Sequence, residues 1–180
     1  MNAVMRFDVR TSMKLQRHKN PAVDKVLLGI TKSANGGMIW IMTGLVLLAV
    51  PGYREAGIFY FEVLAATAVV NNLILKSAFM RKRPCDLFKK IPVLIKRPHG
   101  SSFPSGHTAI SFACAAALCA ICLPAGIFAL CLATIIGFTR IYFFVHFFTD
   151  VLFGVLSGLT TAAVCIFIFL AYKRGSWSFA

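Results

Sequence analysis

Three short clusters of basic, histidine and carboxylate residues lie at or near the ends of strongly apolar segments of this 180-residue chain. Ionisable side chains are costly at membrane depth and usually mark functional sites there. Cations can hold a phosphate ester, one histidine can attack phosphorus, and a second histidine can protonate the leaving oxygen. The combination therefore predicts phosphoryl chemistry. The clusters are Lys76 with Arg83 and Pro84; Pro104, Ser105, Gly106 and His107; and Arg140, His146 and Asp150.

The composition indicates a membrane protein. Hydrophobic residues make up 58% of the chain and charged residues 14%, and the mean hydropathy is +0.77. A soluble domain has about 25% charged residues. Most of the net charge of +13 indicates cytoplasmic loops and contact with anionic lipid headgroups, and the rest indicates phosphate binding. The chain lacks the pattern of a soluble nucleic-acid-binding module, so nucleic acid is not an expected partner.

Five apolar segments are candidates for membrane-spanning helices. We therefore expect an all-α, polytopic helical bundle that forms one domain over residues 36–175. Each segment approaches the roughly 20 residues that cross the hydrocarbon layer, although the first and third do so only with flanking residues. The segments are residues 36–53, 56–80, 108–123, 124–145 and 151–172. Residues 81–103 form a polar, basic connection suited to a lid or a headgroup-facing loop.

Residues 1–35 form a basic N-terminal segment with seven Lys and Arg residues. Val23, Val26, Leu27 and Ile30 recur at helical spacing within it. This pattern predicts an amphipathic helix that either lies in the membrane interface or packs on the bundle. The sequence Asn-Gly-Gly at 35–37 is expected to end the helix.

In the third cluster, His146 and Asp150 are spaced to share one face at the start of the last helix. A carboxylate that accepts the proton of one ring nitrogen fixes the tautomer and makes the other nitrogen a better nucleophile. The alternative is a structural pair that caps the helix.

In the second cluster, Ser105 is placed as an N-cap of the third span. The exposed N–H groups of a helix start bind anions, and Gly106 lets the backbone approach them closely. An ordinary loop-to-helix cap is the alternative. For the basic residues Lys76, Arg83 and Arg140, the alternative to phosphate binding is anchoring at the membrane surface.

Together, the order and spacing of the three clusters resemble the signature of the type 2 phosphatidic acid phosphatase (PAP2) superfamily. The resemblance covers about residues 70–155 at the level of motifs. Thr139 stands where the family often has Ser, and the five spans contrast with six in many members.

The resemblance implies a role for each residue of the clusters. His146 attacks phosphorus and becomes a phosphohistidine, His107 protonates the leaving oxygen, and Asp150 orients His146. The other residues bind the phosphoryl oxygens: Lys76, Arg83, Ser105, Gly106 and Arg140. Three cations offset the phosphate charge and no acidic cluster could hold Mg²⁺, so we expect neither a metal nor a cofactor. The six cysteines lack the context of a redox or metal site.

We therefore expect an integral-membrane lipid phosphatase in the cell membrane. The small size resembles bacterial carrier-lipid phosphatases, which favours undecaprenyl diphosphate as substrate; phosphatidic acid or phosphatidylglycerophosphate is the alternative. The non-enzyme alternative is a small transporter or a haem protein with His107 and His146 as ligands, which would not need three cations. The basic loops place the site on the cytoplasmic side, whereas carrier-lipid phosphatases usually work on the outer face.

Overall fold

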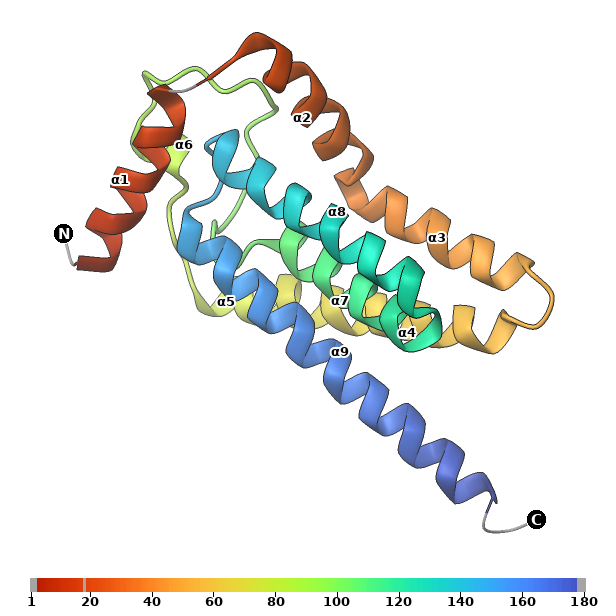
Figure 1. The fold of residues 1–180 in the computed structure, drawn as a ribbon. Coiled ribbons are helices and arrows are strands. Elements are labelled where there is room, and N and C mark those ends of the chain that lie inside the picture. The colour runs from red at the N-terminus through yellow and green to blue at the C-terminus, as the bar shows by residue number, and fades with distance from the viewer. Residues whose placement is uncertain (1–2, 18, 178–180) are drawn as a thin grey trace.

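The structure, a computed structural model, describes residues 3–17 and 19–177 and shows a bundle of helices (Figure 1). The described residues form helices and no strand, which confirms the expected all-α fold. The bundle consists of α3 (Met38–Ala49), α4 (Arg54–Ala68), α7 (Gly106–Ile121), α8 (Leu123–Tyr142) and α9 (Phe148–Trp177).

Helix α7 lies at the centre of the bundle, where it packs against α4, α8 and α9. Small side chains let the backbones approach closely, as is usual between membrane helices. Ala113 and Ala117 are fully buried. A Cβ atom on Gly158 of α9 would lie 2.3 Å from the carbonyl oxygen of Ala109, so only glycine fits there. This contact fixes the start of α7 against α9.

Within the described residues, three helical stretches are long and apolar enough to cross a membrane: Arg54–Ala78, Leu123–Tyr142 and Phe148–Arg174. The other two expected spans are shorter apolar helices, Asn35–Ala49 and Gly106–Ile121. Large apolar side chains of α9 point outward, and Phe167 is 73% exposed. An apolar outer surface of this kind is suited to lipid, so the chain is an integral membrane protein.

The second span continues past α4 as a π-helix, η2 (Val69–Leu75), and ends in α5 (Lys76–Ala78). The backbone N–H of Lys76 donates to the carbonyl of Asn71, one residue further back than in an α-helix. Ser157 of α9 donates to the Asn71 side chain at 3.2 Å. Such π-helical turns often occur at functional sites, and this one directly precedes Lys76.

The N-terminal residues form two helices, α1 (Ala3–Arg17) and α2 (Pro21–Ser33). Helix α2 packs on α8, where Leu27 contacts Tyr142 and Phe143, while Val23 and Val26 remain exposed. Of the two alternatives for this segment, the structure therefore shows a helix packed on the bundle. As expected, α2 ends before residues 35–37, which form the short 3₁₀ helix η1 (Asn35–Gly37).

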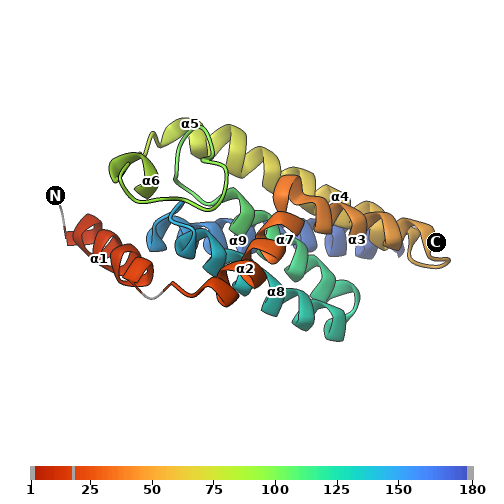
Figure 2. The same cartoon turned by 90° about the horizontal axis from the view of Figure 1, so that it is seen from above.

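Helix α1 lies at the end of the bundle away from the end of α9 (Figure 2). The long connection between α5 and α7, which contains the short helix α6 (Pro84–Leu87), lies at the same end. All three sequence clusters therefore meet where α1 and this connection cover the bundle.

Candidate active site

Hydrogen bonds from the segment just before α7 join the three clusters. The backbone N–H of Ser105 donates to the carbonyl of Asp150 at 3.0 Å, and that of Ser102 donates to the carbonyl of Arg81 at 2.9 Å. The ring nitrogen Nδ1 of His146 lies 2.7 Å from the carbonyl oxygen of Ser102. Residues that are far apart in the sequence thus form one site.

The turn between α8 and α9 presents His146 to this site. Phe144 adopts a left-handed conformation with φ of 61°, and the next two backbone N–H groups both point back to the Arg140 carbonyl. Because the Ser102 carbonyl can only accept, Nδ1 of His146 carries the proton. Nε2 then holds a lone pair, and it lies 3.1 Å from the Arg83 guanidinium.

Burial lowers the pKa of His146 to about 4. Asp150 raises this pKa, and the positive charges of Arg83 and Arg140 lower it. The imidazole is therefore neutral at neutral pH, which is the state that a nucleophile requires.

Asp150 contacts His146 less directly than expected. Its Oδ2 atom lies 3.7 Å from Nδ1 of His146, too far for a hydrogen bond. Oδ2 instead accepts hydrogen bonds from the Ser102 hydroxyl and from the Phe147 backbone N–H, each at 2.8 Å. The second bond caps the N-terminus of α9, because Asp150 is the third residue of that helix. Ser102 therefore stands between the carboxylate and the imidazole.

Arg83 is tied to backbone carbonyls on two sides. Its donors reach the carbonyls of Gly100, Val145, His99 and Ser101 at 2.9 to 3.3 Å, in addition to Nε2 of His146. A guanidinium has five N–H donors, so this set engages all of them. For His146 to attack phosphorus, its contact with Arg83 must give way to a phosphate oxygen.

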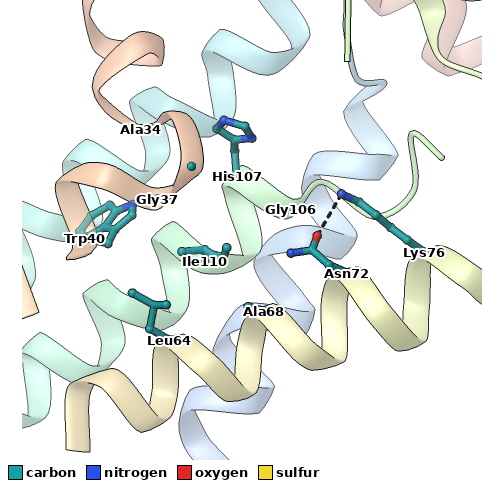
Figure 3. A pocket seen from close by; sticks show the side chains of 11 residues that line it. Ala34, Gly37, Trp40, Leu64, Ala68, Asn72, Lys76, Gly106, His107 and Ile110 are labelled. Atoms are coloured by element: carbon teal, nitrogen blue, oxygen red, sulfur yellow. Dashed lines mark hydrogen bonds between the residues drawn. The ribbon is translucent and has the colours of Figure 1, made fainter. Parts of the chain in front are cut away.

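The other two expected phosphate ligands, Arg140 and Lys76, keep spare donors. Arg140 is 3% exposed and donates to the Thr31 hydroxyl at 2.7 Å. Its buried Nε atom has no partner within the described part of the chain. Lys76 donates to Asn72 at 3.0 Å and passes close to Gly106, where a Cβ atom would lie 3.2 Å from the ammonium (Figure 3).

The second cluster differs in one detail from the prediction. Ser105 is the N-cap residue of α7, but among the described residues its side chain makes no capping bond. Its buried hydroxyl instead accepts from Thr108 at 2.9 Å. Ser105 therefore occupies the expected N-cap position, but its side chain does not act as the cap. His107 projects from the first turn of α7, and its Nε2 lies 3.4 Å from the Asn35 side chain.

His107 borders two cavities. One, of about 320 Å³, is lined by Lys76 and Asn72 as well as by Trp40, Leu64 and Ile110 (Figure 3). The other, of about 510 Å³, we call the basic cavity; of the described residues that line it, none is acidic. Its positively charged and imidazole residues are Lys32, Lys96, Arg97, His99, His107 and Arg140.

Among the described polar residues that were not predicted from the sequence, Arg81 and Ser102 contact the third cluster, and Asp8 contacts Arg81. Arg81 lies between two predicted cations, and its side chain bonds to the side chains of Asp8 and Asp150. A signal was present for Asp8, because the chain has only 6 acidic residues against 19 basic ones. An acid inside a basic segment points to a specific partner.

The fold and the site define a helical membrane protein in which a buried histidine faces several cations. The sequence profile of the PAP2 superfamily matches residues 56–174, which include all three clusters. The chain therefore belongs to the PAP2 superfamily. No curated protein sequence matches it.

Two crystal structures have the same fold. One is the first transmembrane PAP2 type phosphatidylglycerolphosphate phosphatase from Bacillus subtilis, with 24% identity and a TM-score of 0.78 over 97% of this chain and 90% of that one. The other is LpxE from Aquifex aeolicus, with 24% identity and a TM-score of 0.78 over 89% of this chain and 94% of that one. At 24% sequence identity, the similarity to these two structures establishes the fold of the chain.

Proposed function

We propose that this chain is a membrane lipid phosphatase that works through a phosphohistidine at His146. The observation that carries the proposal is the state of the His146 ring. Its Nδ1 proton is held by the Ser102 carbonyl, and its Nε2 lone pair faces the Arg83 guanidinium. A phosphate drawn to that cation would lie in reach of the lone pair.

The proposed reaction has two steps. The Nε2 lone pair of His146 forms a bond to phosphorus while the bond from phosphorus to the leaving oxygen breaks. His107 gives a proton to that oxygen. Water then attacks the phosphohistidine, His107 takes a proton from this water, and the bond from phosphorus to nitrogen breaks. Both histidines return to their initial states and phosphate is released.

The phosphoryl group needs positive charge and hydrogen-bond donors rather than covalent help. We assign the charge to Lys76, Arg83 and Arg140, and further hydrogen bonds to Ser105 and Gly106 at the start of α7. Asp150 keeps His146 in place through Ser102. This set of residues supplies the charge compensation that metal ions supply in other phosphatases.

We predict full activity in excess EDTA, because the proposed reaction uses side-chain cations only. The measurement is phosphate release by purified protein in detergent, with a Mg²⁺-dependent phosphatase in parallel to show that chelation is complete. If EDTA removed activity and Mg²⁺ or Zn²⁺ restored it, the metal-free reaction would be wrong.

For the substrate, we propose a polyprenyl diphosphate such as undecaprenyl diphosphate. The basic cavity supports this choice, since it borders both His107 and the buried Arg140 and offers further cations for a second phosphate. The second candidate is phosphatidylglycerophosphate, because the Bacillus subtilis protein of the same fold is named for that activity. Phosphatidic acid has a single phosphate, which leaves the further cations of this cavity without an anion to bind.

We predict that the variant Lys32→Ala/Lys96→Ala loses roughly tenfold in kcat/KM for polyprenyl diphosphate, from about 0.5–1 kcal/mol for each exposed charge. For phosphatidic acid the loss should stay within about twofold. The matched control is Lys25→Ala/Lys90→Ala, which removes one exposed lysine from α2 and one from the connection, outside the cavity. Equal losses for both lipids would contradict a second-phosphate site.

A further inference from the structure

Asp8 belongs to α1, and its carboxylate is fully buried against the first turn of α9. Its Oδ2 atom accepts from the Arg81 guanidinium at 2.6 Å and from the Thr149 hydroxyl at 2.5 Å. Its Oδ1 atom accepts from the Thr149 backbone N–H at 3.1 Å. A buried carboxylate is tolerated only when it is paired in this way. Asp8 therefore attaches α1 to the first turn of α9.

Arg81 connects Asp8 with Asp150. One of its terminal nitrogens binds Asp8, and the other lies 2.6 Å from Oδ1 of Asp150 and 2.7 Å from the Thr149 hydroxyl. The guanidinium also lies 4.5 Å from the centre of the Phe147 ring. These contacts hold the Arg81 head group from several directions.

The other oxygen of Asp150 continues the chain of contacts. It accepts from the Ser102 hydroxyl, and the Ser102 carbonyl holds the Nδ1 proton of His146. A continuous path of polar contacts thus runs from Asp8 through Arg81, Asp150 and Ser102 to His146.

We propose that Arg81 is a positioning residue for His146 and that Asp8, from α1, completes the site by holding Arg81. The inference rests on the proposed role of His146 as nucleophile. Arg81 touches neither the imidazole nor the phosphate-binding residues, so it acts by fixing Asp150 and, through Ser102, the tautomer and direction of the ring.

Removal of Arg81 has two physical consequences. Oδ1 of Asp150 loses its partner, so the carboxylate can turn toward Nδ1 of His146, which lies 3.7 Å away from Oδ2. A carboxylate that moves closer to the ring favours the protonated imidazole and so raises the pKa of His146. The other charged or titratable groups that act on His146 are Arg83, Arg140 and His107, and they stay unchanged in such a variant.

The test compares Arg81→Met, Arg81→Lys and Asp8→Asn in the full-length protein in detergent. Arg81→Met should lower kcat roughly 10- to 100-fold and leave KM within about threefold, since the phosphate ligands remain. The acidic limb of its kcat profile should move up by roughly half a pH unit or more. Arg81→Lys keeps the charge and should keep the parent pH profile.

Asp8→Asn should lower kcat with KM unchanged, because the amide no longer attracts the guanidinium. The double variant Asp8→Asn/Arg81→Met should be no slower than Arg81→Met, because Asp8 acts through Arg81. Glu55→Gln, which breaks the exposed Glu55–Lys173 pair, is the control and should match the parent.

Two results would overturn the proposal. One is an unchanged kcat in Arg81→Met. The other is a lower kcat in Arg81→Met with the parent pH profile and with a loss that adds to the loss in Asp8→Asn. If Arg81→Met fails to fold, Asp8→Asn and Arg81→Lys still decide it, because a parent-like kcat in Asp8→Asn contradicts it. Trapping of the phosphoenzyme in the parent protein tests the proposed function independently of the Arg81 variants. If no phosphohistidine forms there, the proposed function fails, whatever the Arg81 variants show.

Discussion

His146→Ala should abolish lipid phosphate hydrolysis, with a loss of at least about 10³-fold in kcat. The reason is that the proposed nucleophile is the Nε2 lone pair of His146, which a fixed tautomer holds toward the Arg83 guanidinium. The first measurement is phosphate release. The second is trapping of the ³²P-labelled phosphoenzyme, whose phosphorus–nitrogen bond is recognised because acid cleaves it. Helix content and elution of the variant in detergent should match the parent.

Two variants make this result specific. Arg54→Ala removes an exposed charge at the start of α4, away from the three clusters, and should keep parent activity. His107→Ala should slow phosphoenzyme formation, with the least loss for a substrate whose leaving group needs no proton. Turnover near the parent rate in a correctly folded His146→Ala protein would rule out the nucleophile.

Arg140→Ala should weaken inhibition by orthovanadate by roughly 30-fold or more. Vanadate can adopt the five-coordinate geometry that phosphorus would pass through between His146 and His107 in the proposed reaction. Removing one guanidinium from a buried anion site costs about 2–5 kcal/mol, of which 1.4 kcal/mol corresponds to tenfold in affinity. The inhibition constant in the parent and the variant measures this effect.

Arg140 is a cleaner probe of anion binding than Arg83. Arg83 also holds the carbonyls of His99, Gly100 and Ser101, so its removal would disturb the loop as well as the charge. Arg140 has a single hydrogen bond to Thr31 and a buried Nε with no partner among the described residues. Arg54→Ala again serves as the control, and equal vanadate sensitivity in all three proteins would show that Arg140 does not hold the anion.

The sequence alone determined the class of fold and indicated the cations and histidines of the candidate site. Apolar runs of membrane length dictate helices, because backbone polar groups must be satisfied within each span. The cations and histidines at the ends of these runs were visible because charged residues are rare in such a chain. Their common location follows from spans that end at the same membrane surface.

Only the tertiary structure decided which atoms contact one another. The spacing of His146 and Asp150 suggested a direct hydrogen bond, but the capping demand of α9 and the hydroxyl of Ser102 take that carboxylate oxygen. The sequence could not show this, because Ser102 approaches through a loop whose course depends on packing.

The contacts of the two N-terminal helices also depend on packing, so the sequence indicated only the apolar face of this segment. Asp8 of α1 and Thr31 of α2 reach Arg81 and Arg140 across more than 70 residues of sequence. Periodicity reports which face of a helix is apolar, and it carries no information about the partner that a single polar residue on that helix will meet. Such contacts are set by the docking of α1 and α2 on the bundle, which the three-dimensional packing determines.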